Sequence, residues 1–250
     1  MTTVTTSQLL ARISELEAEL GQRTREAAEK EQQLERYAAD LRETFKEERA
    51  RAHELRRSYM LTVRALAGAV EARDAYTGRH AERVAAYGLQ IASAAGMQLG
   101  DEPQIEFGFL LHDAGKVAVP DAILFKPGPL TPAERAIVEQ HPLTGWKIVR
   151  DIEFLGAARD VIRSHHERWD GMGYPDGLAG TDIPLSARVF AVADTLDALT
   201  TTRPYRRASS FARARAIITR DSGTHFDPEI IAAYESLPDS RLEQIRKEIG

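Results

Sequence analysis

Residues 165–175 read HHERWDGMGYP, and this segment marks the point where a helix gives way to a loop. Two adjacent histidines, His165 and His166, close an apolar run with helical spacing. A glycine-rich turn and a Tyr-Pro pair follow at once. Side chains that commonly bind metal ions therefore stand beside a loop that can approach a phosphate closely.

Helical signals lie on both sides of this segment. A stripe of apolar residues predicts a helix at 80–91, and apolar runs predict further helices at 106–111, 156–166 and 185–200. Residues 168–184 hold four glycines and two prolines, so they are predicted to form a loop. No segment alternates apolar and polar residues as an exposed strand does, and the predicted fold is therefore all-α.

Two helix starts are marked by capping residues. Thr131 and Glu134 form a capping box with a proline between them, so a helix is expected to begin there and to place His141 near its end, before Pro142. Asp227 and the proline after it start another helix in the same way.

Residues 1–60 form a charged extension ahead of a globular domain at 61–250, where the composition changes to alanine, valine and leucine. One seven-residue series carries Ile13, Leu20, Ala27, Leu34, Leu41 and Leu55, and a second carries Ala38, Phe45, Ala52 and Tyr59. This spacing predicts a long helix that forms a parallel coiled-coil dimer, although Arg23, Lys30 and Glu48 interrupt it. The alternative is a solitary, solvated helix.

Composition limits the class of protein. The net charge of -5 does not favour binding to a nucleic acid polymer. The absence of cysteine excludes disulfides and thiolate chemistry, so that any metal must be bound by histidine and carboxylate. Neither a membrane span nor a signal sequence is recognisable, and a cytoplasmic location is expected.

Histidines and aspartates gather at predicted helix ends. Apart from His225 in a late loop, the histidines of the globular part lie on or beside apolar helices: His80, His112, His141, His165 and His166. A single histidine of this kind is usually structural, but five in one helical domain favour a metal site. Asp113 and Asp194 stand in apolar surroundings where a carboxylate needs a partner, which is a metal or, for Asp194, an arginine such as Arg188 or Arg203.

Such a set of donors exceeds what one tetrahedral ion takes. It suits two ions of higher coordination number, bridged by a carboxylate and a water, an arrangement that serves phosphoryl displacement. Nitrogen and oxygen donors favour iron or manganese, with nickel or zinc as alternatives.

These residues, in this order, resemble the HD superfamily of metal phosphohydrolases. Residues 165–206 resemble the signature of its HD-GYP branch, and so do 112–116 (HDAGK) and 71–80 (EARDAYTGRH). The likeness covers about residues 61–236. It implies an HD-type helical bundle, preceded here by the long helix. It also implies hydrolysis of cyclic di-GMP to linear pGpG, in some members onward to GMP, by attack of a metal-bridging hydroxide.

The resemblance implies a role for each matching residue. One divalent ion is expected to be bound by His80, His112 and Asp194, and the other by His141, His165 and His166. Asp113 is expected to bridge the two ions, and Lys116 to face the scissile phosphate or its bridging water, which makes both catalytic.

Substrate contacts follow from the same resemblance. Tyr174 is expected to lie against a guanine or ribose, and Arg203 and Arg206 to contact phosphate or guanine. The glycines of the turn, Gly171, Gly173 and Gly177, are expected to give it backbone freedom. Some members carry a glutamate four residues before the first histidine and recruit a third metal with it; Tyr76 stands there in this chain, which predicts two ions.

Three other functions compete with hydrolysis of cyclic di-GMP. The domain could bind cyclic dinucleotide or a partner protein as a signalling scaffold with little turnover, or act on cyclic GMP-AMP. A nucleotidase acting on linear nucleotides is disfavoured by the Gly-Tyr-Pro segment. The N-terminal helix is expected to serve as a dimerisation stalk or to dock on a separate sensor protein.

Overall fold

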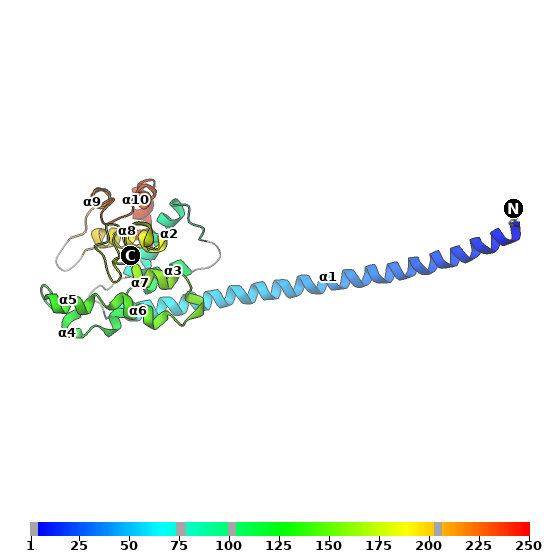
Figure 1. Cartoon of the computed structure of the whole chain (residues 1–250), viewed down its shortest axis with the longest axis horizontal. Coiled ribbons are helices and arrows are strands. Elements are labelled where there is room, and N and C mark those ends of the chain that lie inside the picture. Colours follow the sequence, from blue (N-terminus) through cyan, green and yellow to red (C-terminus); the bar gives the residue numbers. More distant parts are fainter. Residues whose placement is uncertain (1–4, 74–78, 100–103, 203–206) are drawn as a thin grey trace. The chain divides into compact units, whose positions relative to one another are not determined.

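The computed structural model describes residues 5–73, 79–99, 104–202 and 207–250. Helices make up its regular structure (Figure 1), and the described residues contain no strand beyond one isolated bridge between Ser222 and Phe226. The predicted all-α fold is therefore confirmed. No helix among these residues combines the length and the apolar character that crossing a membrane requires.

The helices follow one another with short connections. The α-helices are α1 (Thr6–Glu71), α2 (His80–Ala94), α3 (Gln104–Leu111), α4 (Asp121–Leu124), α5 (Pro132–Val138), α6 (His141–Val149), α7 (Ala158–Ser164), α8 (Leu185–Thr200), α9 (Phe211–Arg220), α10 (Pro228–Glu235) and α11 (Asp239–Ile249). Three 3-10 helices lie between them: η1 (Ala114–Ala118), η2 (Glu153–Leu155) and η3 (Gly180–Asp182).

Contacts within the chain separate two units, Met1–Ser58 and Tyr59–Gly250. Helix α1 belongs to both, because it continues without a break to Glu71. Its buried residues are Val63 and Ala67, both in the second unit. The first unit is thus a stretch of helix whose described residues have no core of their own.

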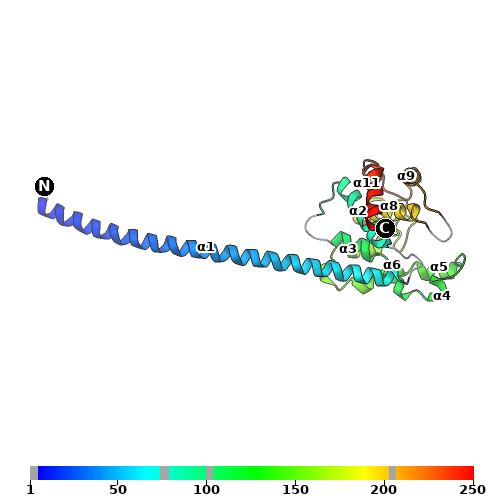
Figure 2. The ribbon, with the colours of Figure 1, turned by 180° about the vertical axis from the view of Figure 1, so that it is seen from behind.

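The core of the second unit forms around α8, which is apolar on most of its surface, as a helix surrounded by others must be. Helices α2 and α7 lie against it, and α3 lies against both of these. Helix α11 also packs against α2, and the view from behind shows it beside α2 (Figure 2). Small residues allow close contact: a side chain at Gly88 would collide with the ring of Phe109.

One predicted helix boundary is wrong. The capping box of Thr131 and Glu134 does start α5, but α5 ends at Val138 and His141 is the first residue of the next helix, α6. Proline is tolerated in the first helical turn, where its missing N–H has no intrahelical partner in any case. Pro142 therefore lies in the first turn of α6, whereas the sequence had favoured it as a stop signal.

A close approach of two backbones fixes α6 against η1. A Cβ added to Gly115 would collide with the carbonyl oxygen of His141 and would come within 2.5 Å of the Gly145 nitrogen. Gly145 faces back, with the Gly115 nitrogen 3.1 Å from where its own Cβ would stand. The two glycines therefore let the segment after Asp113 touch the helix that begins with His141.

Replacing Gly115 with alanine is expected to destabilise the domain by about 1–3 kcal/mol, because a backbone cannot move aside as a flexible side chain can. Urea unfolding monitored by circular dichroism measures this. Gly68→Ala is the matched control: Gly68 is exposed in α1 with nothing within 4 Å of an added Cβ. That variant is expected to gain up to about 1 kcal/mol from helix propensity. Equal effects in the two variants would contradict the close approach.

Candidate metal centre

Three helices bring together the first group of donors. His80 begins α2, His112 follows the last residue of α3, and Asp194 lies within α8. One donor atom from each residue lies within 4.8 Å of the other two. His80 Nε2 is 3.5 Å from Asp194 Oδ1. The structure thus gathers residues that are 32 and 82 positions apart in the sequence into one group that could hold a metal ion.

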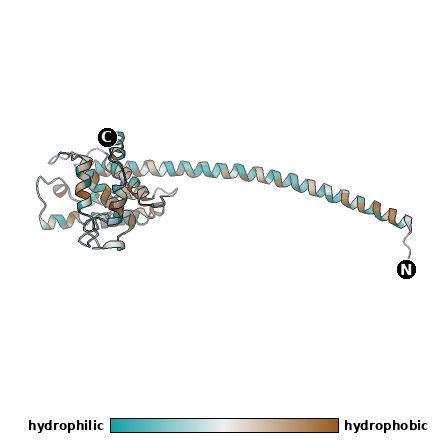
Figure 3. Ribbon diagram, turned by 90° about the horizontal axis from the view of Figure 1, so that it is seen from above, coloured by the Kyte–Doolittle hydropathy of each residue, from teal (hydrophilic) through white to brown (hydrophobic). Residues whose placement is uncertain are grey.

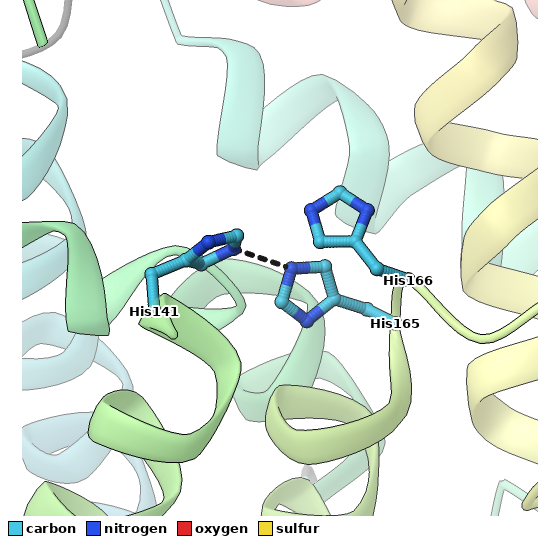
Figure 4. Close-up of side chains that lie close together, drawn as sticks. All are labelled: His141, His165 and His166. Carbon is cyan, nitrogen blue, oxygen red and sulfur yellow. Dashed lines mark hydrogen bonds between the residues drawn. The ribbon is translucent and has the colours of Figure 1, made fainter. Parts of the chain in front are cut away.

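The second group consists of histidines alone. His141 begins α6, and His165 and His166 directly follow α7 (Figure 4). Their donor nitrogens also lie within 4.8 Å of one another. The ring of His165 lies 5.1 Å from that of His141 and 4.2 Å from that of His166, measured between centroids. This group too is of a kind that could hold a metal ion.

Asp113 connects the two groups. Its carboxylate lies 3.0 Å from His112 Nε2, in the first group, and 3.3 Å from His141 Nε2, in the second. Lys116, one turn of η1 further on, brings its Nζ to 2.8 Å from the same carboxylate. All seven residues predicted as metal ligands, together with Lys116, therefore meet in one place.

Backbone carbonyls fix the orientation of three of the imidazoles. In each case Nδ1 lies 2.7–2.9 Å from the carbonyl oxygen three residues earlier, which makes Nδ1 the protonated nitrogen and leaves Nε2 as an acceptor. The pairs are His112 with Phe109, His141 with Val138 and His165 with Ile162. Each Nε2 lone pair therefore points into the site.

A carboxylate performs the same task for the remaining histidine of the first group. His80 Nδ1 lies 2.8 Å from Asp197 Oδ2, and Arg83 donates to both oxygens of Asp197 at 2.6 and 3.2 Å. Asp197 stands one turn after Asp194 on the same face of α8. The sequence analysis did not predict the contact of Asp197 with His80.

The start of α2 is held from a second direction. The N-cap residue Arg79 supplies no side-chain cap, and instead Glu71, the last residue of α1, accepts a hydrogen bond from the Ala81 N–H at 2.5 Å. Glu71 also lines a small cavity with His80 and Asp113. The sequence analysis assigned no role to Glu71, because its partner belongs to a different helix.

Two nitrogens in the second group face each other in a way that a cation would stabilise. His141 Nε2 and His165 Nε2 approach to 3.1 Å, although both rings carry their proton on Nδ1. Two lone pairs at this distance repel unless a positive charge lies between them. Two nitrogens bound to one ion at about 2.1 Å and at right angles lie about 3 Å apart. The donor set therefore fits a metal of five or six coordination.

Burial keeps two imidazoles of the second group neutral. It lowers the pKa of His166 to about 3 and, with the adjacent imidazoles, holds the pKa of His165 well below its usual value. Burial would raise the pKa of Asp113, but His112 and Lys116 hold it well below the usual range. His165, His166 and Asp113 thus present two neutral imidazoles and an ionised carboxylate, the forms that bind metals.

The loop after His166 is anchored to the end of α7. Glu167 is buried, and its carboxylate accepts the backbone N–H groups of Asp176 at 2.7 Å and Leu178 at 3.0 Å. Tyr174 lies between Glu167 and Asp176 in the sequence, and its ring stacks on His166 with centroids 4.7 Å apart. A flat aromatic surface therefore borders the donors, as the predicted role of Tyr174 requires.

The glycines of this loop serve two different needs. Gly171 and Gly177 have φ values of 75° and 67°, which confirms the predicted need for backbone freedom. At Gly173 that prediction is wrong, since its φ is not positive. A side chain there would collide with the backbone of residues 166–168. The close approach of this backbone explains why residue 173 is a glycine.

Some predicted residues lie elsewhere or outside the described part of the chain. Arg188 donates to Asp227 at 2.6 Å, which accounts for that arginine without Asp194. Arg203, Arg206 and Tyr76 lie outside the described residues.

Comparison with known proteins agrees with this helical domain of paired histidine and aspartate donors. Residues 64–230 match the family described as HD domain. This match covers more than half of the chain, which therefore belongs to the HD domain family. Its resemblance to the HD-GYP branch is confirmed.

Two curated relatives support the same conclusion. The 3'3'-cGAMP-specific phosphodiesterase 2 of Vibrio cholerae is 39% identical over 213 residues, which cover 80% of this chain and 38% of the relative. A cyclic di-GMP phosphodiesterase of Thermotoga maritima is 39% identical over 180 residues, which cover 71% of this chain and 49% of the relative. The chain thus spans less than half the length of these relatives.

The fold is also that of a solved HD domain. The HD domain of the phosphodiesterase PgpH from L. monocytogenes superposes with a TM-score of 0.52 at 19% identity. The match covers 72% of this chain and 98% of that domain. At this identity the likeness concerns the fold alone.

Acid is expected to destabilise the metal-free domain. In the unfolded chain His165 and His166 take up protons as the pH falls below 6.5, whereas their lowered pKa values keep them neutral in the folded state. Stability should therefore fall by roughly 2 kcal/mol between pH 6 and 5. The raised pKa of His80 has the opposite effect on stability, which it increases as the pH falls toward 6.5. Below pH 6.5 this contribution no longer changes.

Urea unfolding of chelator-treated protein at several pH values measures this dependence. Replacing His166 with glutamine, which does not titrate, should reduce the slope by about half. An unchanged slope in that variant would contradict the neutral, buried imidazole.

Proposed function

We propose that this chain is a metal-dependent phosphodiesterase that hydrolyses cyclic di-GMP to linear pGpG. One observation carries the proposal: two groups of three donors stand on either side of a single carboxylate, Asp113, with Lys116 beside it. Such a pair of sites suits displacement at phosphorus, where both the attacking and the leaving oxygen need stabilisation.

In this proposal each donor group holds one divalent transition metal ion, and Asp113 contacts both. Iron or manganese suits these nitrogen and oxygen donors best, with nickel or zinc as alternatives. When bound, the pair of ions supplies an activated water and positive charge near the phosphate. The contacts of Nδ1 with backbone carbonyls and with Asp197 support the assignment, because metal-binding histidines are commonly oriented in this way.

The remaining side chains bind and orient the substrate. The ammonium of Lys116 is held beside Asp113, where it offsets negative charge on the phosphoryl oxygens. Tyr174 provides a flat surface for a guanine or ribose. Arg203 and Arg206 remain the predicted contacts to phosphate or guanine.

The choice of cyclic di-GMP rests on the names of relatives, among them the Thermotoga maritima enzyme. Cyclic GMP-AMP is the second candidate substrate, since the Vibrio cholerae relative is named for it and matches 80% of this chain. Two ions, as Tyr76 predicts, favour pGpG as the product over continued hydrolysis to GMP.

We further propose that residues 61–250 form the catalytic domain and that residues 1–60 join two copies in a parallel homodimer in the cytoplasm. The large apolar side chains of the first unit are exposed, which supports a partner helix. A separate sensor protein that docks on this helix is the alternative partner.

Replacing Asp113 with asparagine is expected to reduce turnover of cyclic di-GMP by at least a thousandfold, because the amide cannot neutralise two cations. The protein is reconstituted with iron or manganese without oxygen, products of both cyclic dinucleotides are separated by chromatography, and bound metal is measured on the same sample. Two ions per chain are expected in the parent protein. Asp160→Asn, an exposed aspartate of α7, is the matched control.

Full turnover in the Asp113 variant would sink the catalytic assignment. Tight binding of cyclic di-GMP with negligible turnover in the reconstituted parent protein would instead favour a signalling scaffold.

Deleting residues 1–55 is expected to convert a dimer into a monomer, since this removes the exposed apolar residues from Leu9 to Leu55. Light scattering measures the mass, and the turnover of the same sample shows whether the helix affects catalysis. A deletion variant that stays dimeric and fully active would contradict both proposed roles of the helix.

A further inference from the structure

The apolar side chains of the first unit are left in water by the single chain. Leu20, Leu34 and Leu41 are each about two thirds exposed, and Phe45 is 71% exposed. Figure 3 shows apolar residues recurring among polar ones along α1. Because these residues recur on one side of a helix of 66 residues, only another long helix can cover them.

The spacing of these residues changes once along the helix. From Leu9 to Tyr37, steps of four and three residues alternate, through Ile13, Leu16, Leu20, Arg23, Ala27, Lys30 and Leu34. From Phe45 to Tyr59 they alternate again, through Glu48, Ala52 and Leu55. Between the two stretches, Tyr37, Leu41 and Phe45 are separated by two successive steps of four.

We propose that two copies of the chain pair in parallel along the series of positions from Leu9 to Tyr59, which we call the seam. Their coiled coil then contains one stutter, centred on Leu41. The inference rests on the homodimer proposed above and specifies its geometry. Two successive steps of four are equivalent to four residues inserted into a heptad repeat, which locally unwinds the supercoil. The seam therefore passes from one heptad phase to the next at this level.

The stutter determines the orientation of the pair. In a parallel dimer identical residues meet, so that both stutters lie at the same level by symmetry. In an antiparallel dimer they coincide only if the helices cross at Leu41. Leu9 would then lie opposite position 73, beyond the end of α1 at Glu71, and the stretch from Ile13 to Leu20 would lie opposite positions 62–69, where Val63 and Ala67 are already buried in the second unit. Parallel pairing covers the whole seam, about 70 Å of helix.

The charged residues of the seam do not prevent this pairing. Arg23 contacts Glu19 at 2.7 Å, and Glu48 contacts Arg51 at 2.8 Å, all within one helix. Two of the three interruptions therefore bring their own counter-ions. The aliphatic stem of Lys30 can lie along the seam while its ammonium reaches water.

Because the chain has no cysteine, single cysteines report the register directly. Phe45→Cys and Ala52→Cys test the seam with the stutter. Thr44→Cys and Arg51→Cys test an uninterrupted heptad, which would place those positions in the seam. All four residues are exposed in the single chain. The first pair is expected to form disulfide-linked dimers at least tenfold faster than the second, in the full chain under mild oxidation.

Leu34→Cys lies in the seam in both registers and serves as the reference. Faster cross-linking at positions 44 and 51 than at 45 and 52 would overturn the stutter while leaving the dimer. A dimeric mass without cross-linking at position 34 would overturn parallel pairing. A monomeric mass by light scattering, with the helix retained in circular dichroism, would remove the dimer on which the inference rests.

Discussion

The carboxylate of Asp113 is the interaction on which the site depends. Histidines from two donor groups and the ammonium of Lys116 converge on its two oxygens at 2.8–3.3 Å. Without this negative charge, the imidazoles of His112 and His141 and the ammonium of Lys116 would have no anionic group between them. The carboxylate can reach both groups only because Gly115 lets the following turn touch the backbone of α6, which carries His141. The absence of a side chain at Gly115 is thus required for the Asp113 carboxylate to contact both donor groups.

Much of this arrangement is readable from the sequence, because its signals are local. The His-Asp pair at 112–113, the apolar run of α8 and the capping box of Thr131 each depend on residues a few positions apart. The prediction of the helix boundary at Pro142 failed because the local signal there is compatible with two structures. Proline at position 142 is compatible with the end of one helix or the first turn of the next, and only packing against η1 decides that His141 begins α6.

Contacts between distant helices could not be predicted in this way. Asp197 orients His80 across 117 positions of sequence, and Glu71 holds the amide of Ala81 from a different helix. Neither contact leaves a periodic or compositional trace. The sequence did contain one indication, since Asp194 and Asp197 share a face of an apolar helix, where two carboxylates each require a partner. One is placed among the metal donors and the other between His80 and Arg83.

The first unit shows the opposite balance. Its helix follows almost entirely from sequence periodicity, yet none of its described residues is buried within the chain, and an isolated helix has little to stabilise it in water. The partner helix proposed above would therefore stabilise this unit more than any other segment described. Helix α1 nevertheless extends without a break to Glu71, which holds the start of α2 beside His80. A passive stalk and a signalling element would share this covalent path. In a signalling element, binding of a partner would change the hydrogen bond from Ala81 to Glu71, whereas in a passive stalk it would not.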